Sequence, residues 1–389
     1  MIDISNLKNL KVILFHRSVG PENDDRIIKI SSSLIKHGCF FHAYLWDRSN
    51  LKRKGLFACG SRWTTFRIPF GSKKIPRPGT LYTIYEIFYE TLQAFFTIKK
   101  TRPDVIIIQN HRLFLLVQVV LFFHKDSRLI WDLRELPKGF YNTGYIPRIY
   151  FSYLANSVGS LIVANESRKN FLVSNFKLSN SLKLATLPNY PLRDWSINTD
   201  NSVFNKDNRL LNSDSFVYIQ SASSSSRFPY NSVKAALIAS TLNIVITGFF
   251  EDSVIRKLRC EFGAEFDRRV IFLGYVSSFA ISALLGKAYV SLIFYRSDEP
   301  NNEYCEPNRL YQALNKGVPV IVGSNLGLRT PIEVFRNGVV LSSDGRSLDS
   351  IILAFNELHI NYMKYKSNSV LAMGNCIWED IELSLIKFI

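Results

Sequence analysis

A chain of 389 residues is long enough for two domains with substantial hydrophobic cores, since single cores stop growing at roughly 250–300 residues. Its 47% hydrophobic and 13% aromatic residues exclude a disordered chain. Five widely spaced cysteines without a C-x-x-C pair indicate neither a disulfide framework nor a zinc ribbon. The formal net charge of +16 favours an anionic partner or surface.

This positive charge is confined to one half of the chain. Residues 1–195 hold 29 Lys and Arg against 13 Asp and Glu, whereas residues 196–389 hold 19 of each. The basic clusters are Lys52-Arg53-Lys54, Lys73-Lys74 with Arg77, and Lys99-Lys100 with Arg102. Each cluster by itself fits a solvated face equally well. An excess confined to one half indicates a half that faces phosphates or an anionic bilayer surface.

The sequence carries no pattern that predicts export or membrane insertion. The first residues, MIDISNLKNLKVILFHR, pass from a polar start into a strand-like run and do not resemble a signal peptide. The apolar run Leu113–Phe123 is shorter than the roughly 20 residues of a spanning helix, and it predicts a buried helix. With the cysteine pattern, this predicts a cytoplasmic protein.

Short β-branched or aromatic runs alternate with amphipathic stretches, which is typical of parallel sheets with helical crossovers and predicts the α/β class. In the first half, strands are predicted at 11–16, 40–46, 105–109, 129–132 and 161–164, and helices near 26–37, 81–100, 112–124 and 147–158. A polar, turn-rich stretch from Pro188 to Asp214 predicts a linker.

The second half repeats this pattern, with strands predicted at 216–220, 243–247, 270–273, 289–293, 318–322 and 339–341. We therefore predict two Rossmann-like α/β domains that face a central cleft, at residues 1–195 and 196–372. Residues 373–389 are predicted to form a helix that crosses back to the first domain. In such folds ligands bind at the carboxyl ends of the strands.

Several common signatures are absent. The chain has no P-loop, no G-x-G-x-x-G fingerprint, no G-x-S-x-G elbow and no H-E-x-x-H. It also has no Asp-x-Asp triplet to hold a divalent metal on a diphosphate, so no metal site and no cofactor are expected.

One dense segment carries chemical information. A strand at 289–293 is followed by a polar loop, a helix that starts near Pro307, a Lys316-Gly317 stop and the next strand. A helix N-terminus beside Arg309 is suited to an anionic group such as a nucleotide diphosphate. Gln312, one turn into the helix, has hydrogen-bonding groups suited to sugar hydroxyls.

The segment Glu306–Ile321 resembles the donor-binding segment of GT-B glycosyltransferases, notably of the family 4 (group 1) type, in which a P-N-K-[LF]-[YF]-E helix precedes a G-x-P-V-I strand. Further stretches resemble the family in the expected order: Asp25-Arg26, Leu133-Arg134-Glu135, Ala164–Ser167, Leu187–Pro191, Phe272–Val276 and Asn337–Val340. The resemblance covers nearly the whole chain. It implies that the second domain binds a nucleotide sugar and that the basic first domain binds the acceptor.

The resemblance also implies roles for particular residues of the second domain. Arg309 and Arg227 correspond to cations that offset the charge of the leaving nucleoside diphosphate. Gln312 stands where the family has a glutamate for the ribose hydroxyls, and Tyr304 stands where it has the first glutamate of E-x7-E. Glu303 and Glu306 flank Tyr304, and either is a candidate for the donor sugar. Pro307, Asn308 and Leu310 complete the implied donor-binding set.

Acid–base candidates lie in the first domain and in the Glu306 loop. His111 follows a strand, and the ordinary pKa of a histidine suits proton transfer at neutral pH. A histidine in this position more commonly caps a helix or packs against one. Glu135 matches the glutamate of the family's D-x-H-E stretch, and Glu306 is the third catalytic candidate. Arg134 replaces the family's histidine and is a candidate for acceptor phosphate. Gly20 either allows the backbone to approach the substrate closely or is an ordinary turn glycine.

These observations predict a glycosyltransferase that moves a sugar from a nucleotide diphosphate sugar to a hydroxyl of a glycan, carried on a lipid, in bacterial surface polysaccharide (O-antigen or capsule) assembly. The expected location is the cytoplasm, peripheral on the inner membrane face through the basic first domain. The resemblance alone favours retention of configuration. The alternatives are an epimerase on the same fold and a non-catalytic subunit that binds nucleotide sugar or glycan. The neutral second half argues against nucleic acid.

Overall fold

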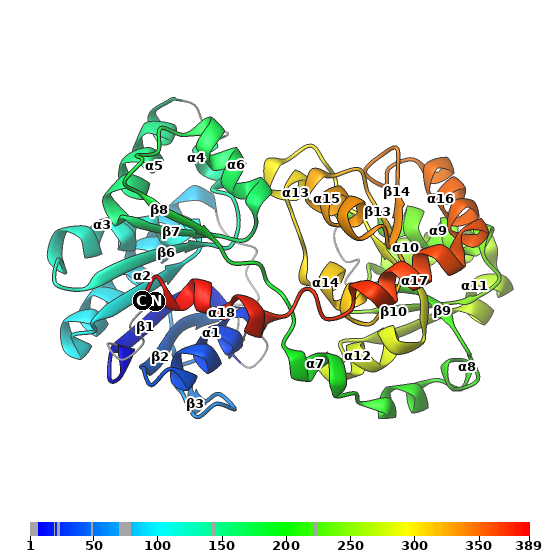
Figure 1. Cartoon of the computed structure of the whole chain (residues 1–389), viewed down its shortest axis with the longest axis horizontal. Coiled ribbons are helices and arrows are strands. Elements are labelled where there is room, and N and C mark those ends of the chain that lie inside the picture. Colours follow the sequence, from blue (N-terminus) through cyan, green and yellow to red (C-terminus); the bar gives the residue numbers. More distant parts are fainter. Residues whose placement is uncertain are drawn as a thin grey trace. The chain divides into compact units, whose positions relative to one another are not determined.

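The structure is a computed structural model that describes residues 7–18, 20–21, 24–47, 50–69, 79–141, 145–220 and 225–389. It consists of two compact units (Figure 1). Unit 1 comprises residues 1–188 and 381–389, and unit 2 comprises residues 189–380. Of the basic clusters, Lys73, Lys74 and Arg77 lie outside the described residues.

Unit 1 is built on an eight-stranded sheet with the order β3-β4-β2-β1-β5-β6-β7-β8. All neighbouring strands are parallel except β3 and β4. The strands are β1 (Lys11–Ser18), β2 (Phe40–Asp47), β3 (Lys54–Leu56), β4 (Arg62–Thr65), β5 (Val105–Gln109), β6 (Arg128–Leu133), β7 (Ser160–Val163) and β8 (Lys183–Thr186). The central strand β5 is buried at every residue, as expected for a parallel strand covered on both faces.

The helices of unit 1 follow the strands in the βα order of a parallel sheet. They are α1 (Asp25–Lys36), α2 (Gly79–Thr101), η3 (His111–Leu113), α3 (Phe114–Phe123), α4 (Lys138–Tyr141), α5 (Tyr145–Val158) and α6 (Glu166–Asn175). Asp24 caps α1 by accepting the backbone N–H of Ile27 at 3.3 Å.

Unit 2 is built on a six-stranded parallel sheet with the order β11-β10-β9-β12-β13-β14. Its strands are β9 (Phe216–Gln220), β10 (Asn243–Thr247), β11 (Val270–Gly274), β12 (Ala288–Ile293), β13 (Val320–Val322) and β14 (Gly338–Val340). Because side chains alternate along a strand, Phe216 and Tyr218 enter one hydrophobic core while Val217 and Ile219 enter the other. The two parallel sheets with helical crossovers confirm the predicted α/β class.

The helices of unit 2 are mostly short. They are α7 (Arg193–Ile197), η4 (Asn201–Lys206), α8 (Asn208–Leu211), η5 (Ser225–Arg227), α9 (Pro229–Ala239), α10 (Asp252–Phe262), α11 (Ala264–Arg269), α12 (Ser278–Lys287), α13 (Pro300–Glu303), α14 (Asn308–Asn315), α15 (Leu326–Phe335), α16 (Leu348–Ile360) and α17 (Tyr362–Ala372).

The last helix, α18 (Trp378–Ile386), passes from unit 2 to unit 1. At its start, the backbone N–H of Trp378 donates to the carbonyl of Pro191 at 2.9 Å. Further along, Glu382 accepts hydrogen bonds from Ser33 at 2.8 Å and from Lys36, both on α1. The closing residues Ile381–Ile389 are therefore packed as part of unit 1.

The structure differs from the sequence-based expectation in two places of unit 1. The β3–β4 hairpin and β8 were not predicted, because they are short and mostly polar or partly exposed. The run Leu113–Phe123 is helical but not wholly buried, since Phe122 is 61% exposed and Phe123 is 67% exposed. Only one face of α3 contacts the core, and the continuous apolar run conceals which face that is.

Candidate functional site

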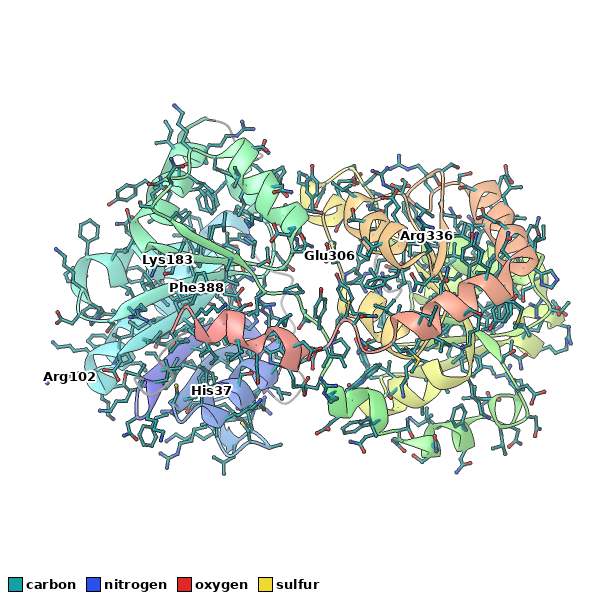
Figure 2. All side chains as sticks on the ribbon, viewed as in Figure 1. His37, Arg102, Lys183, Glu306, Arg336 and Phe388 are labelled. Atoms are coloured by element: carbon teal, nitrogen blue, oxygen red, sulfur yellow. The ribbon has the colours of Figure 1, made fainter. Side chains whose placement is uncertain are left out.

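The dense segment predicted from the sequence lies at the carboxyl edge of the unit 2 sheet. Strands β9 and β12 are parallel neighbours with Ile219 opposite Leu292, so Gln220 and Phe294 leave the sheet at the same edge. The helix α14 begins at Asn308, and Pro307 is its N-cap residue. Figure 2 shows Glu306 on the loop between α13 and α14.

Arg309 is held at this edge by the ends of both strands. Its Nη1 donates to the backbone carbonyl of Gln220 at 2.6 Å, and its Nη2 lies 3.4 Å from the carbonyl of Phe294. The residue is 7% exposed, and its buried Nε has no hydrogen-bond partner among the described residues. Burial lowers the pKa of Arg309 from its ordinary value, but an arginine stays charged at neutral pH. The site therefore holds a buried cation whose Nε–H group can donate a hydrogen bond to a ligand.

A second arginine lies against the same aromatic ring. The guanidinium carbon of Arg309 is 4.8 Å from the ring centroid of Tyr295, and that of Arg227 is 5.3 Å from it. Both distances are in the range of cation–π contacts. Arg227 and Arg309, the two cations predicted from the sequence to meet a diphosphate, are thus brought together on one tyrosine. Two like charges at close range favour the binding of a dianionic group.

Tyr295 was not predicted as a site residue, and neither was the residue that holds its loop. Asp344 accepts the backbone N–H of Ser297 at 2.9 Å and pairs with Arg346 at 2.7 Å. Burial raises the pKa of Asp344, but the bonds from Arg346 and the Ser297 backbone outweigh it and bring the pKa to about 2. Asp344 is therefore an anion at neutral pH. Tyr295 follows the end of β12, and this position could have indicated a site residue from the sequence. Nothing in the sequence connects Asp344 to this loop.

The predicted carboxylates of this segment contact neighbouring groups. Glu303 Oε1 accepts the backbone N–H of Leu326 at 3.0 Å, at the N-terminus of α15. Glu306 Oε2 accepts the hydroxyl of Tyr311. Gln312 Oε1 accepts from Gln220 Nε2 at 3.3 Å, so the amide that replaces the family's glutamate faces the end of β9.

The other members of the predicted donor set lie at the start of α14. Asn308 is its first residue, and Leu310 is 2% exposed within the hydrophobic core that contains Ile293 and Val320. Leu310 therefore anchors α14 to the sheet.

In unit 1, Arg134 follows β6 and belongs to a buried charged cluster. Its Nη1 donates to Asp24 Oδ2 at 2.8 Å and lies 2.7 Å from His16 Nε2, which is itself 3.2 Å from Asp24. Burial would raise the pKa of Asp24, but Arg134 and His16 hold it well below its usual range. Burial and Arg134 lower the pKa of His16. The charge of Arg134 is thus compensated by Asp24. Gly20 is buried beside this cluster, and its backbone N–H donates to Ser18 at 3.2 Å.

His111 and Glu135 also lie at the carboxyl edge of the unit 1 sheet, after β5 and β6. Burial lowers the pKa of His111, Glu135 raises it, and Arg112 lowers it. The attraction from Glu135 means that the structure brings these two predicted catalytic residues within electrostatic range of each other. His111 is only partly buried, and its Nδ1 has no hydrogen-bond partner in the described part of the chain. A neutral imidazole with a lowered pKa can accept a proton at neutral pH.

Beneath this edge lies a buried ion pair that sequence analysis missed. Arg26 contacts Asp132 through two bonds, Nε to Oδ2 at 3.0 Å and Nη2 to Oδ1 at 2.9 Å. Its Nη1 donates to the carbonyl of Leu187 at 2.7 Å, and Gln109 donates to Asp132 at 2.8 Å. Arg26 is 2% exposed. Its hydrogen bonds connect α1 with β6 and with Leu187, the residue that follows β8. The match of Asp25-Arg26 to the family motif therefore has a structural basis here.

The described residues contain no group of three or more His, Cys, Asp or Glu side chains placed to hold a metal ion. Among their helices, none has the length and apolarity to cross a bilayer.

Comparison with known proteins supports the fold. No protein-family model and no curated protein sequence matches the chain. Solved structures do match it over nearly their whole length. Sucrose-phosphate synthase from Thermosynechococcus elongatus has a TM-score of 0.73 at 14% identity and covers 97% of this chain and 98% of its own. Anabaena HepE in complex with UDP and glucose has a TM-score of 0.73 at 15% identity, with 97% and 99% covered.

A third match, α,α-trehalose 6-phosphate synthase from Burkholderia multivorans, has a TM-score of 0.72 at 8% identity, with 98% of both chains covered. HepE has also been solved in complex with UDP-glucose. At these identities the likeness concerns the fold. Together with the two mainly parallel sheets and the closing helix, it shows that this chain has the two-unit GT-B fold of these structures.

Proposed function

We propose that the protein is a glycosyltransferase that takes a sugar from a nucleotide diphosphate sugar and transfers it to a hydroxyl group of a glycan acceptor. The observation that carries this proposal is the placement of Arg227 and Arg309 on Tyr295 at the carboxyl edge of unit 2. The fold likeness to HepE, which was solved with UDP and with UDP-glucose, supports a nucleotide-sugar donor.

In this proposal the two arginines bind the diphosphate and stabilise the charge that develops on it as the sugar leaves. The N-terminus of α14 adds backbone N–H groups and the positive end of its dipole. Because these groups are already in place before reaction, they need little reorganisation when the bond breaks. We propose that the reaction needs no metal ion, since fixed cations meet the diphosphate. Glu306 and Glu303 are the candidates for the donor sugar, and Gln312 is the candidate for the ribose.

On the acceptor side, we propose His111 as the base that accepts the proton of the attacking hydroxyl. Its lowered pKa keeps it neutral, and nearby Glu135 stabilises the imidazolium that forms. The positive charge of residues 1–195 supports a lipid-linked acceptor at an anionic membrane surface, in polysaccharide assembly. Flotation with anionic vesicles at low and high salt tests this part, and a protein that ignores the vesicles at low salt contradicts it.

The donor site is tested by calorimetric titration of the full chain with UDP, GDP, ADP, CMP and dTDP, with and without Mg²⁺. We expect one diphosphate to bind selectively and without a need for Mg²⁺. Arg309→Ala should weaken its binding by about tenfold or more, because a charged hydrogen bond is lost, while binding of the nucleoside stays nearly unchanged. Lys364→Ala on α17 is the matched control, since it removes one exposed positive charge of the same unit. Equal losses for diphosphate and nucleoside would remove Arg309 from the phosphate site.

Turnover distinguishes the proposal from its alternatives. With the donor identified, release of the nucleoside diphosphate should require an acceptor, whereas an epimerase would convert the donor alone and a binding subunit would show no turnover. Glu306→Gln should lower the rate and leave the fold intact. Tyr311→Phe is the control, because it removes the hydrogen bond to Glu306 but keeps the carboxylate. A rate lowered equally by both variants would assign Glu306 a structural role.

A further inference from the structure

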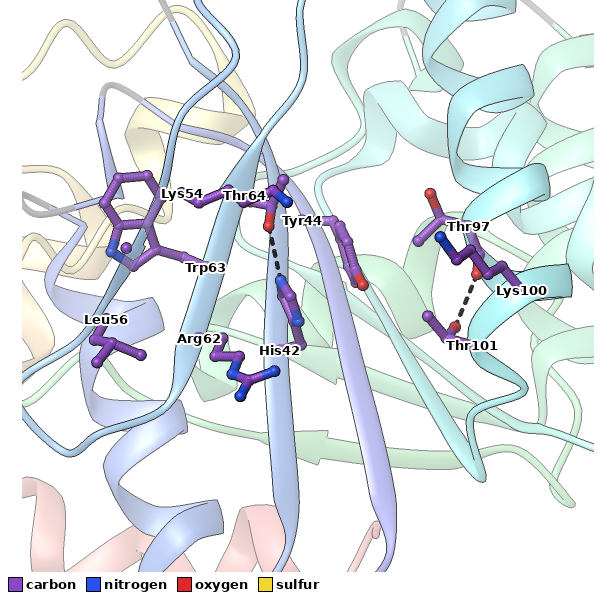
Figure 3. A pocket seen from close by; sticks show the side chains of 11 residues that line it. His42, Tyr44, Lys54, Leu56, Arg62, Trp63, Thr64, Thr97, Lys100 and Thr101 are labelled. Atoms are coloured by element: carbon purple, nitrogen blue, oxygen red, sulfur yellow. Dashed lines mark hydrogen bonds between the residues drawn. The ribbon is translucent and has the colours of Figure 1, made fainter.

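Unit 1 contains a second candidate site, far along the strands from the edge where His111 and Arg134 lie. It is a cavity of about 560 Å³ between strands β2, β3 and β4 and the last turn of α2. Figure 3 shows His42, Tyr44, Lys54 and Arg62 on the strands and Thr97, Lys100 and Thr101 on the helix across from them. His42 and Arg62 lie in the first half of their strands, whereas the predicted acceptor residues follow the carboxyl ends.

Strand register explains why these side chains share one face. Arg62 is opposite His42 on β2 and opposite Leu56 on β3. Thr64 is likewise opposite Tyr44 on one side and Lys54 on the other. Directly opposite residues in a sheet point to the same face, so all six side chains face α2.

The floor of the cavity is formed by stacked rings. The rings of His42 and Tyr44 are stacked, with centroids 4.2 Å apart and planes at 6°. His42 Nε2 lies 2.9 Å from Thr64 Oγ1, which fixes the ring. On the other face of the hairpin, the backbone of Gly55 lies against the indole of Trp63, where a Cβ would be only 2.4 Å from the ring.

The walls carry positive charge without compensation. Lys54, Arg62 and Lys100 are exposed, and within the described part of the chain none has an ion-pair partner. The residues that line the cavity include no Asp or Glu. Burial, then Arg62, then Lys54 lower the pKa of His42 to about 4. The histidine therefore experiences a positive potential, which is what an anion-binding cavity requires.

A second cavity, of about 470 Å³, continues from the first. It shares His42, Tyr44, Arg62 and Thr101 with it. Its remaining lining is mainly apolar: Val12, Ile13, Ile35, Phe40, Phe41 and Pro103. Lys11 also lines this cavity, and its backbone N–H donates to Asp104 Oδ2 at 2.7 Å. Arg62 thus lies where a cationic cavity meets an apolar one.

We propose that the two cavities together bind a phosphate ester that carries a hydrocarbon group. The phosphate lies among Lys54, Arg62 and Lys100, and the hydrocarbon occupies the apolar cavity. Phosphate oxygens match the guanidinium of Arg62 and the ammonium groups of the two lysines. The site is separate from the proposed donor and acceptor sites, so its failure leaves the glycosyltransferase proposal untouched.

The test is calorimetric titration of the full chain with inorganic phosphate, butyl phosphate and butanol, together with co-sedimentation with phosphatidylcholine vesicles with and without phosphatidylglycerol. Butyl phosphate should bind more tightly than inorganic phosphate, by roughly fourfold for each methylene buried. Butanol should not bind measurably. Binding of butyl phosphate without vesicle binding identifies a free phosphate ester, and binding only to phosphatidylglycerol vesicles identifies a lipid headgroup. Either outcome supports the site when the double variant described next loses that binding, because the overall positive charge of residues 1–195 by itself favours anionic vesicles.

The double variant Arg62→Gln/Lys100→Gln should weaken binding of the effective probe by at least about tenfold. Its control is Lys125→Gln/Lys183→Gln, which removes the same charge from exposed positions of unit 1. As a second measurement, the NMR titration of His42 should show a raised pKa when the ester binds. No binding of any probe, equal loss in both double variants, or an unchanged His42 with bound ester would each overturn the proposal.

Discussion

Glu90 on α2 provides a sharp test of the electrostatics of unit 1. The residue is fully buried, and its Oε1 lies 3.2 Å from Arg17 Nε. Arg17 also pairs with Glu86 at 3.2 Å, so one arginine serves two carboxylates. Burial raises the pKa of Glu90 from 4.5 to about 7, and Glu86 adds to the rise while Arg17 opposes it. The cost of burying this charge therefore exceeds the attraction of its partner.

The raised pKa has a defined effect on stability. Between pH 4.5 and about 7 the folded state binds more protons at Glu90 than the unfolded state, so the free energy of unfolding falls as pH rises. The loss is nearly complete at about pH 8, roughly one unit above the folded-state pKa. Each pKa unit corresponds to about 1.4 kcal/mol, which gives a total loss of about 3 kcal/mol. Glu90→Gln removes this dependence, and its stability relative to the wild type should rise by that amount between pH 4.5 and pH 8.

The assay is urea unfolding at several pH values, followed by fluorescence of the buried Trp46 and Trp131 of unit 1. A separate transition is allowed for each unit, because two-unit proteins need not unfold in one step. Glu166→Gln is the control, since that carboxylate is exposed beside Lys169. If the difference in the free energy of unfolding between the wild type and Glu90→Gln stays constant across this pH range, the pKa of Glu90 is not raised in the folded state and the prediction is wrong.

Two further predictions concern the packing of each unit. Arg26→Ala leaves the buried charge of Asp132 without its partner and should cost unit 1 about 3–5 kcal/mol in urea unfolding, with much of the loss recovered in Arg26→Met/Asp132→Leu. A loss below about 1 kcal/mol would show that the pair is not structurally important. In unit 2, Gly338→Ala would place a Cβ 2.1 Å from the carbonyl of Val320, and it should lower the melting temperature by forcing β13 and β14 apart. Gly286→Ala in α12 meets open space and should raise stability by up to about 1 kcal/mol, so equal melting shifts for the two alanines would contradict this.

The local sequence was sufficient to predict the α/β class and most strands and helices, because hydrophobic periodicity is a local property. The segment from β12 through α14 to β13 was predicted in its order, and the helix expected near Pro307 begins at Asn308, with Pro307 as its N-cap residue. Arg227 and Arg309 were named from the family resemblance, and their role at a diphosphate stays a prediction; the structure places both against the ring of Tyr295. The exposure of Phe122 and Phe123 was not predictable. A continuous apolar run has no polar side chains that would mark the side of the helix that faces solvent.

Only the tertiary structure determines which residues that are distant in sequence contact one another. Strand β9 lies between β10 and β12, and this order brings Arg227 and Arg309 to the ring of Tyr295. Strand register likewise places Lys54 and Arg62 beside His42 under the end of α2, although each cation by itself resembles an ordinary solvated residue. The physical reason is that a residue's periodicity determines its element, whereas its neighbours depend on sheet order and register. Those are determined by the packing of the whole unit around its core.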